Sequence, residues 1–510
     1  MRHSPRPVRR VAAVVLAVVV GLGSVGGGPA AATAESASDV APAAAATTGR
    51  AACEPTPFTA AFDAELRRRW PNQRFTASVH DRRTGCWYEY RPDRRITTAS
   101  VLKAEILAGL LLRAQREGRG LTAWEHARVG PMISRSADPE ASALWLSLGG
   151  VAGMRRVDAD FGLTQTTPAS PWGLTSTSAR DRTRLMEQLL YGGGPLTASY
   201  RAIARGYLLD VVASQRWGIT AGVPPGTRVP MKNGFFSSRC CRWRLNSSGA
   251  VETTGGGYVV TILSDQWPNE ASGIAGVNFV SRVIAARLAG PYPPFATQGK
   301  FVDRAWADVL GRTPTYSELM AAVGTTAWDR RRAGSVLAPL YSRSEHTTVG
   351  PPVIRLYLAA LGRPPDGSSY ALREWQLRAG RTDLRSIARF VAESAELGLT
   401  GLDDEAFVDE AARRVLGRSA TDHERTAWSE RIALGWAHRG DVLLSYTESN
   451  VSRWFLHHRV TTAAVYLTML ERAPEASALA YWSGALGSGS TLAGLTNSVF
   501  LSAEYRDRVR

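Results

Sequence analysis

Apolar and polar positions alternate along residues 74–80 and 86–90 of the 510-residue chain, on either side of a turn. This period of two is typical of β-strands that bury one face. Three further strands are predicted over residues 229–236, 243–251 and 258–264, the last two joined by a glycine-rich turn. A helical period instead fits Phe58, Phe62 and Leu66, most of residues 100–208, and a closing helix over 278–288. Two strands, a block of helices, three strands and a helix predict an α+β domain, with an antiparallel five-stranded sheet and a helical subdomain.

A different pattern follows Gly290 and recurs about every 50 residues. Leu-Gly-Arg or Leu-Glu-Arg begins at Leu310, Leu361, Leu416 and Leu470, and the copies continue to Trp328, Trp375, Trp428 and Trp482. The clearest copies end in Ser-x-Glu, at Ser394 and Ser502. Repetition at this period indicates stacked helical units, none of which can bury its apolar face alone. We therefore expect an all-α domain of four copies over residues 298–510, with the tryptophans packed between helices.

The first 50 residues have the composition of an export segment and a linker. Arg2, Arg9 and Arg10 precede an apolar run over 11–20, and small residues end at Ala34. This order is typical of a secretory signal peptide, and the apolar run is too short to anchor the chain in a membrane. We predict a signal peptide over residues 1–34, a disordered linker over 35–50, and a first folded domain over 51–292. The mature protein is then secreted without a membrane span, by the general or the twin-arginine route, and cell-wall association is a further hypothesis.

The net charge of +16 raises the question of a nucleic-acid partner. The arginines are scattered among acidic residues, however, and no aromatic stacking motif accompanies them. We therefore expect no nucleic-acid partner. On a secreted protein, a basic solvated surface more plausibly meets anionic wall polymers.

The four cysteines are Cys53, Cys86, Cys240 and Cys241. An exported chain meets an oxidising compartment, so two disulfides are allowed, with three connectivities. A bond between Cys53 and Cys86 would tie the first helix to the first hairpin, and would leave the adjacent pair either free or in a vicinal ring. No C-x-x-C motif is present and the histidines nearest the cysteines, His80 and His126, are not clustered, so neither a metal site nor a cofactor is expected.

The candidate chemistry begins at Ser100 and Lys103, which open an apolar helix. Residues three apart share one helix face, so the lysine amine can take the serine proton, provided that burial lowers its pKa. Further along the chain lie Ser136-Ala-Asp138 and, on a predicted strand, Lys232-Asn-Gly-Phe235. These elements, in this order, resemble the S-x-x-K, S-D-N and K-T-G boxes of the serine β-lactamase and penicillin-binding-protein superfamily. The likeness spans about residues 55–290 and is greatest to the class A β-lactamase-like serine hydrolases of actinobacteria, in which K-N-G replaces K-T-G.

The resemblance implies a chemical role for each motif. Ser100 attacks a carbonyl and forms an acyl-enzyme, with Lys103 as the proton acceptor. The backbone N–H groups of Ser100 and Phe235 form an oxyanion hole. Ser136 relays the proton to the leaving group, and Lys232 adds positive charge for a substrate carboxylate.

Asp138, Asn233 and Gly234 are the candidates for substrate contact. Gly234 would let the substrate lie close to the strand, because it has no side chain. Asp138 departs from the family pattern, which has an asparagine at this position. An amide can donate a hydrogen bond to a substrate carbonyl, whereas an ionised carboxylate cannot. Asp138 either pairs with Lys103, which would hold that lysine protonated, or points away from it.

A second departure concerns the loop over residues 161–180, which contains no Asp or Glu. Class A β-lactamases use a glutamate of the corresponding loop to activate the hydrolytic water, so efficient β-lactam turnover is not expected. His80-Asp81 could suggest a Ser-His-Asp triad, but the chain has no G-x-S-x-G elbow to accompany it.

The repeats over about residues 298–508 resemble the secreted bacterial repeat called domain of unknown function 4214, which implies a helical module for interaction or localisation, with a cell-surface partner. The leading hypothesis is thus a secreted serine hydrolase that acts through an acyl-enzyme on an amide or ester, such as a β-lactam or a cell-wall peptide. The alternative is a catalytically weakened scaffold that binds the wall or another protein.

Overall fold

The computed structural model describes residues 52–239, 242–254 and 256–510. The predicted signal peptide, the predicted linker over 35–50, and Cys240 and Cys241 lie outside these residues. Within the described ranges, no helix combines the length and the apolar character needed to cross a bilayer.

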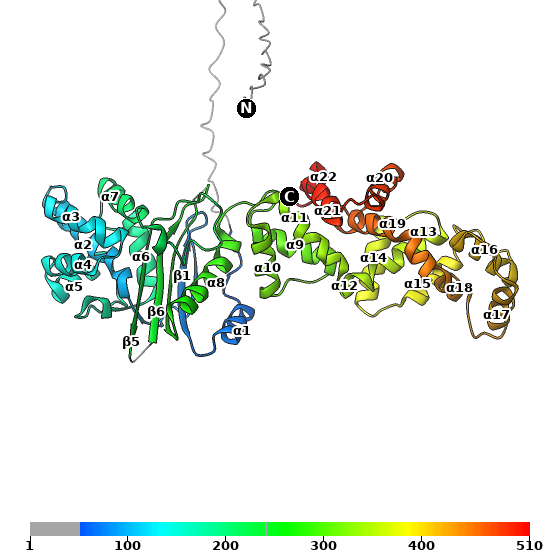
Figure 1. The fold of residues 1–510 in the computed structure, drawn as a ribbon, viewed down its shortest axis with the longest axis horizontal. Helices are drawn as coiled ribbons and strands as arrows, with labels where there is room; N and C mark the ends of the chain where they lie inside the picture. The colour runs from blue at the N-terminus through cyan, green and yellow to red at the C-terminus, as the bar shows by residue number, and fades with distance from the viewer. Residues whose placement is uncertain (1–51, 240–241, 255) are drawn as a thin grey trace, which may run out of the picture. The chain divides into compact units, whose positions relative to one another are not determined.

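Five antiparallel strands form the main sheet, in the order β2-β1-β7-β6-β5 (Figure 1). They are β1 (Arg74–Asp81), β2 (Cys86–Tyr90), β5 (Met231–Ser238), β6 (Arg242–Val251) and β7 (Tyr258–Trp267). The predicted five-stranded antiparallel sheet is confirmed. Two further strands, β3 (Ile96–Thr97) and β4 (Ser176–Thr177), pair with each other beside it. Each is only two residues long, which is too short for an alternating pattern to show in the sequence.

Helices cover both faces of the main sheet (Figure 1). Those of this region are α1 (Ala60–Arg69), α2 (Leu102–Arg116), α3 (Ala123–Ser134), α4 (Asp138–Ser147), α5 (Gly150–Phe161), α6 (Ala179–Leu190), α7 (Ala198–Leu209) and α8 (Glu270–Leu288). Short 3-10 helices occur at η1 (Ala99–Val101), η2 (Trp172–Leu174) and η3 (Ala213–Gln215). Helix α8 packs on β6 and β7, while α6 packs on the same sheet from the helical block between β3 and β5.

Helix α8 begins at Glu270, eight residues before the start that the sequence predicts. Asn269 caps it, since its side chain accepts a hydrogen bond from Ser272 N at 2.8 Å. The added turns contain Gly273 and Gly276, which weaken the helical signal in the sequence. A Cβ atom on Gly276 would lie 2.1 Å from the ring of Trp267, so the glycine is what allows the helix to lie flat on the sheet.

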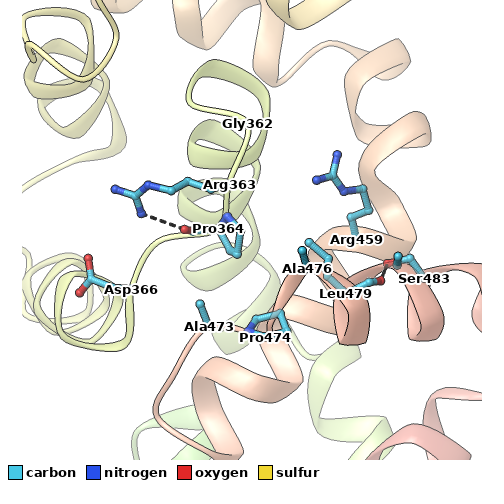
Figure 2. Close-up of a pocket in the computed structure, with 11 residues that line it drawn as sticks. Gly362, Arg363, Pro364, Asp366, Arg459, Ala473, Pro474, Ala476, Leu479 and Ser483 are labelled. Atoms are coloured by element: carbon cyan, nitrogen blue, oxygen red, sulfur yellow. Dashed lines mark hydrogen bonds between the residues drawn. The ribbon is translucent and has the colours of Figure 1, made fainter.

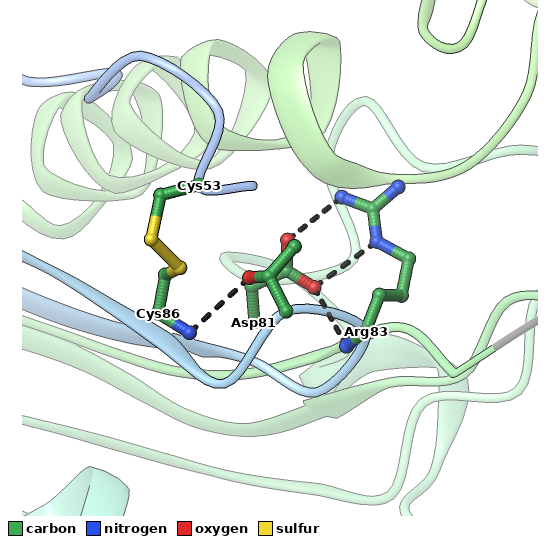
Figure 3. The surroundings of a disulfide bond; sticks show 5 residues. Cys53, Asp81, Arg83 and Cys86 are labelled. Atoms are coloured by element: carbon green, nitrogen blue, oxygen red, sulfur yellow. Dashed lines mark hydrogen bonds and ion pairs between the residues drawn. A yellow bond between two sulfur atoms is a disulfide. The ribbon is translucent and has the colours of Figure 1, made fainter. Parts of the chain in front are cut away.

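A disulfide joins Cys53 to Cys86, with 5.8 Å between the Cα atoms (Figure 3). It ties the segment before α1 to the first residue of β2. Beside it, the Arg83 guanidinium donates to both carboxylate oxygens of the buried Asp81, at 3.0 and 2.9 Å. The turn between β1 and β2 is therefore fixed by an ion pair on one side and by a covalent bond on the other.

The rest of the described chain is helical, as predicted. Its α-helices are α9 (Gln298–Leu310), α10 (Tyr316–Thr326), α11 (Ala333–Leu337), α12 (Ser344–Thr347), α13 (Gly350–Ala360), α14 (Gly367–Arg378), α15 (Leu384–Ala392), α16 (Asp404–Leu416), α17 (Asp422–Ala433), α18 (Arg439–Thr447), α19 (Asn450–Met469), α20 (Ala476–Gly487), α21 (Leu492–Leu501) and α22 (Ala503–Arg508). The first of the four copies packs on the sheet region, where the Tyr316 hydroxyl donates to the Pro57 carbonyl at 2.7 Å.

The arginine of each Leu-Gly-Arg or Leu-Glu-Arg element closes a turn. Arg312, Arg363, Arg418 and Arg472 each donate to the carbonyl of the residue that follows, at 3.0, 3.1, 2.9 and 3.0 Å. The remaining guanidinium N–H groups bind carboxylates, such as Glu396 for Arg363 and Glu504 for Arg472. Figure 2 shows the second and fourth turns on either side of a hollow of about 570 Å³. The repeated motif thus fixes how each long helix passes into the next.

Three of the four tryptophans pack as expected. Trp328, Trp428 and Trp482 lie partly buried against the hydrophobic cores of the helical region. Trp375 does not follow this prediction, because it is 50% exposed. Its ring is covered by the guanidinium of Arg381, at 4.6 Å from the ring centroid, and this contact replaces packing against a helix.

Removing the disulfide should destabilise the sheet region. The bond closes a loop over a sequence separation of 33 residues. Loop-closure entropy for such a loop predicts a loss of about 3–4 kcal/mol in the double variant Cys53→Ser/Cys86→Ser. Urea unfolding followed by near-UV circular dichroism would measure it. Wild-type protein in excess reductant should lose the same stability, and an unchanged midpoint in both samples would contradict the prediction.

Candidate active site

Ser100 lies in the 3-10 turn η1, directly before helix α2. Asn246 of β6 holds this turn against the sheet, since its side-chain amide donates to the carbonyls of Thr97 and Thr98 at 2.9 and 3.0 Å. Ala99 adopts a φ of 50°, a left-handed conformation that costs a non-glycine residue about 1–3 kcal/mol. Strained backbone of this kind gathers at functional sites, so η1 is a candidate on geometry alone.

The structure brings Ser100, Lys103, Ser136 and Asp138 together around one amine. The Lys103 Nζ lies 2.9 Å from Ser100 Oγ, 3.0 Å from Ser136 Oγ, 2.6 Å from the Ser136 carbonyl oxygen and 2.6 Å from Asp138 Oδ1. Ser136 itself has a φ of 60°, which turns both its carbonyl and its hydroxyl toward Lys103. Of the two alternatives for Asp138, the structure has the ion pair.

The four oxygens around Lys103 outnumber the hydrogen bonds that its amine can make. An ammonium group has three N–H donors and no lone pair, so it cannot donate a full hydrogen bond to each of them. A neutral amine has two N–H donors and one lone pair, and the lone pair can accept the hydroxyl proton of Ser100. Either protonation state therefore has three partners among the four oxygens, and the neutral amine is the state that can take the Ser100 proton.

Opposing effects set the pKa of Lys103. Its side chain is fully buried, and this burial is the largest effect and lowers the pKa. The hydrogen bond and the charge of Asp138 raise it, but the net result lies below the ordinary lysine value. Because the Asp138 side chain is 72% exposed, water weakens its electrostatic influence, which is why burial prevails.

Lys232 of β5 approaches the same serine from the sheet. Its Nζ donates to Ser136 Oγ at 3.0 Å and to the Asn233 carbonyl at 2.8 Å. Burial, and then the charge of Lys103, lower the pKa of Lys232 well below its ordinary value. Ser136 Oγ therefore bridges two buried amines, an arrangement suited to passing a proton between them.

Gly234 and Phe235 follow on β5, which is an edge strand. A Cβ atom on Gly234 would lie 2.7 Å from Ser100 N and 2.5 Å from Val101 N, so only glycine lets the strand approach η1 this closely. Alternate N–H groups of an edge strand have no partner strand. The strand and the start of η1 thus meet at the place where an oxyanion hole formed by the Ser100 and Phe235 N–H groups would lie.

One sequence-based expectation, substrate contact by Asn233, needs correction, and the His80-Asp81 pair that the sequence argues against as a triad has other partners. The Asn233 side chain does not face the pocket: it is fully buried, and its amide donates to the carbonyls of Gln215 and Trp217 at 2.8 and 3.0 Å. Consecutive strand residues point to opposite faces, which places Asn233 away from Lys232. The pair His80-Asp81 forms no triad, because His80 Nδ1 lies 3.1 Å from Glu187 and Asp81 binds Arg83.

A hollow of about 390 Å³ opens above Ser100. Its lining residues are Ala99, Ser100, Asp138, Ser142, Pro171, Trp172, Gly173, Leu174, Phe235 and Phe236. The Trp172 indole donates to Ser142 Oγ at 3.0 Å, and its ring centroid lies 5.0 Å from Lys103 Nζ. Trp172, Leu174 and Phe236 also line the hollow, although the sequence did not mark them as candidates. For Trp172 and Leu174 the only signal was the Pro-Trp-Gly run within the loop that lacks acids, and for Phe236 it was the position directly after the Lys232-Asn-Gly-Phe235 motif.

The acidic residues next to that loop have structural contacts. Asp181 is buried and accepts hydrogen bonds from Gln165 N and Thr166 Oγ1, at 2.7 and 2.9 Å. Glu105 forms a buried ion pair with Arg182. Burial, and then the neighbouring Glu105, raise the pKa of Asp158 to about 8. Among the residues that line the hollow, Asp138 is therefore the one carboxylate available for chemistry.

No protein-family model matches the chain. Solved structures that align with it include an ancestral class A β-lactamase, at 21% identity and a TM-score of 0.39, covering 44% of this chain and 96% of that one. β-Lactamases from Burkholderia vietnamiensis and Streptosporangium roseum align at 20% and 19% identity, with TM-scores of 0.40 and 0.39; each alignment again covers 44% of this chain and 96% of the other.

Proteins of Mycobacterium bovis and Mycobacterium tuberculosis, both named "Putative lipoprotein LppW", are 30% identical to this chain over 220 residues. The alignment covers 41% of this chain and 68% of each mycobacterial protein. Over this stretch the chain belongs to the family of the mycobacterial LppW proteins.

Proposed function

We propose that the sheet region is an extracytoplasmic serine hydrolase that acts through an acyl-enzyme on an amide or ester. The observation that carries the proposal is the distance of 2.9 Å between Ser100 Oγ and the buried Lys103 Nζ. Burial lowers the pKa of this lysine. A hydroxyl becomes an effective nucleophile when a base within hydrogen-bond distance can take its proton.

In the proposed reaction, the Ser100 hydroxyl passes its proton to neutral Lys103 as Oγ attacks the substrate carbonyl carbon. The carbonyl electron pair moves to oxygen, and the N–H groups of Ser100 and Phe235 stabilise the resulting oxyanion. When the pair returns, the bond from carbon to the leaving nitrogen or oxygen breaks. The proton held by Lys103 reaches that atom through Ser136, which leaves an ester on Ser100.

The lining of the hollow supports slow release of the acyl group. Hydrolysis of the ester needs a base for the attacking water. Asp138 is the one carboxylate among the lining residues, and its Oδ1 is engaged by Lys103 at 2.6 Å. We therefore expect the proposed enzyme to be acylated faster than it is deacylated, as a penicillin-binding protein is.

Two observations support the extracytoplasmic location. The disulfide between Cys53 and Cys86 is of a kind that persists in oxidising compartments. The mycobacterial relatives are named as lipoproteins. A cell-wall peptide is then a substrate within reach of the protein.

The engagement of Asp138 with Lys103 also favours a second candidate function, a scaffold that binds wall peptides without turnover. Such a scaffold would hydrolyse chromogenic cephalosporins and esters at the same background rate before and after Ser100→Ala. An enzyme would lose its rate with that substitution.

Acylation at Ser100 is the direct test. The mature protein, incubated with a fluorescent penicillin, should carry one adduct on Ser100, located by peptide mass spectrometry. Ser100→Ala should reduce the labelling rate by at least about 100-fold, because the nucleophile is lost. The control Ser142→Ala, which removes another hydroxyl of the hollow, should still be labelled. Failure of the wild type to form an adduct with penicillins, cephalosporins and activated esters would overturn the mechanism.

The pH dependence of acylation tests the role of Asp138. The reactive form has neutral Lys103, so the rate rises as pH passes the lysine pKa. Asp138 raises that pKa. Asp138→Asn should therefore move the rising limb to lower pH and increase the acylation rate at pH 7 by roughly an order of magnitude.

The matched control for that experiment is Asp160→Asn, which removes the carboxylate that Arg116 binds on α5. This variant should keep the wild-type pH profile. Stopped-flow acylation between pH 5 and 10 would compare the three proteins. A profile for Asp138→Asn that is unchanged, or displaced to higher pH, would contradict control of Lys103 by Asp138.

A further inference from the structure

The first turns of helix α19 carry exposed aromatic side chains. Trp454 is 75% exposed and Phe455 70%. Their ring centroids are 4.9 Å apart with an interplanar angle of 83°, so the two rings are nearly perpendicular and leave most of each ring exposed. Exposed rings at adjacent positions of a single helix are unusual for a surface without a ligand.

The repeat pattern explains why these rings have no cover. In the first and second copies, the preceding helix ends and a non-helical segment separates it from α13 or α16. In the third copy, Ser449 caps the single 20-residue helix α19, which continues into the fourth copy. All but one of its buried residues lie from Val460 onward. The preceding turns therefore extend beyond the packed core.

Two adjoining hollows lie beside this aromatic pair, with volumes of about 930 and 650 Å³. Both are lined by Arg453, His457 and His458. We call the joined hollows, together with Trp454 and Phe455, the α19 groove. The larger hollow also presents hydroxyl groups, from Ser342, Thr347, Thr348, Thr461 and Ser490.

Positive charge exceeds negative charge in the α19 groove. Glu448 lines the larger hollow and is the one carboxylate among the residues that line either hollow. It accepts two hydrogen bonds from Arg355, at 2.8 and 2.7 Å, and one from Arg453, at 2.9 Å. Two guanidinium groups thus share one carboxylate, and Arg453 keeps donors for an anion.

We propose that the α19 groove binds an anionic polysaccharide. The exposed indole of Trp454 suits the apolar face of a sugar ring, Arg453 suits a carboxylate substituent, and the hydroxyl groups of the larger hollow suit sugar hydroxyls. A single nucleic-acid strand would need successive parallel stacking faces along its path, whereas the rings of Trp454 and Phe455 are nearly perpendicular. A flat bilayer cannot enter a concave site, but one extended polymer chain can.

The test compares polymers that separate charge from sugar chemistry. Affinity electrophoresis of the full secreted chain would use polygalacturonate as the anionic sugar, dextran as the neutral sugar and polyglutamate as the anion without sugar rings. We expect retardation by polygalacturonate alone. Retardation by polyglutamate or oligo(dT) to the same degree would overturn the proposal, and so would preferential binding to anionic phosphatidylglycerol vesicles.

Matched variants locate the site. Trp454→Ala and Arg453→Gln should each weaken polygalacturonate binding by about tenfold or more. The controls are Trp436→Ala, which removes a tryptophan that is 74% exposed outside the groove, and Arg459→Gln, which changes the arginine at the hollow of Figure 2. Both controls should bind like the wild type. Unchanged binding by Trp454→Ala, or a concentration-dependent dimer that this substitution abolishes, would refute the assignment.

Discussion

The buried amine of Lys103 is the constraint on which the candidate site depends. Helix α2 carries it into an apolar interior, and an amine there is stable only with polar partners around it. The chain supplies four oxygens, from Ser100, Ser136 and Asp138, at 2.6 to 3.0 Å. Meeting this demand brings η1 and the start of α4 to one point, and Ser136 there also accepts a hydrogen bond from Lys232 of the edge strand β5. The same contacts that satisfy the amine thus assemble the groups that acyl transfer would use.

Close backbone approach is the second requirement, and small side chains and strained backbone make it possible. Gly234 leaves no side chain between β5 and η1, and Asn246 on the neighbouring strand holds η1 in place. The positive φ angles of Ala99 and Ser136 turn their neighbours toward the amine. The helical region uses charge for a comparable purpose, since the repeated arginines close turns through backbone carbonyls. In both regions, polar contacts with the main chain fix the geometry that apolar packing alone leaves open.

The sequence predicts the elements whose signals are local. Alternation locates β1 and β2, short strand-like runs locate β5, β6 and β7, and the spacing of Ser100 and Lys103 places both on one helix face. The family resemblance assigns Asn233 to substrate contact, whereas the alternation of side chains along a strand already points it away from Lys232; the sequence does not predict its partners there, the carbonyls of Gln215 and Trp217. It also misses the first turns of α8. There Gly273 and Gly276 are required because side chains of distant strands leave no room for a Cβ atom. The ion pair between Asp138 and Lys103 stayed one of two alternatives, since only tertiary structure sets its distance.

On the proposed function, Asp138 links substrate binding to the generation of the base. Its carboxylate faces the hollow and also holds Lys103, so a substrate group that donates a hydrogen bond to it competes with the lysine. Any donation that weakens the hold of Asp138 favours the neutral amine, because Asp138 raises the pKa of Lys103. By thermodynamic reciprocity, deprotonation of Lys103 then favours binding of that substrate. A substrate that presents an N–H group to Asp138 would therefore promote its own attack by Ser100, whereas one that presents a carbonyl would gain nothing from this carboxylate.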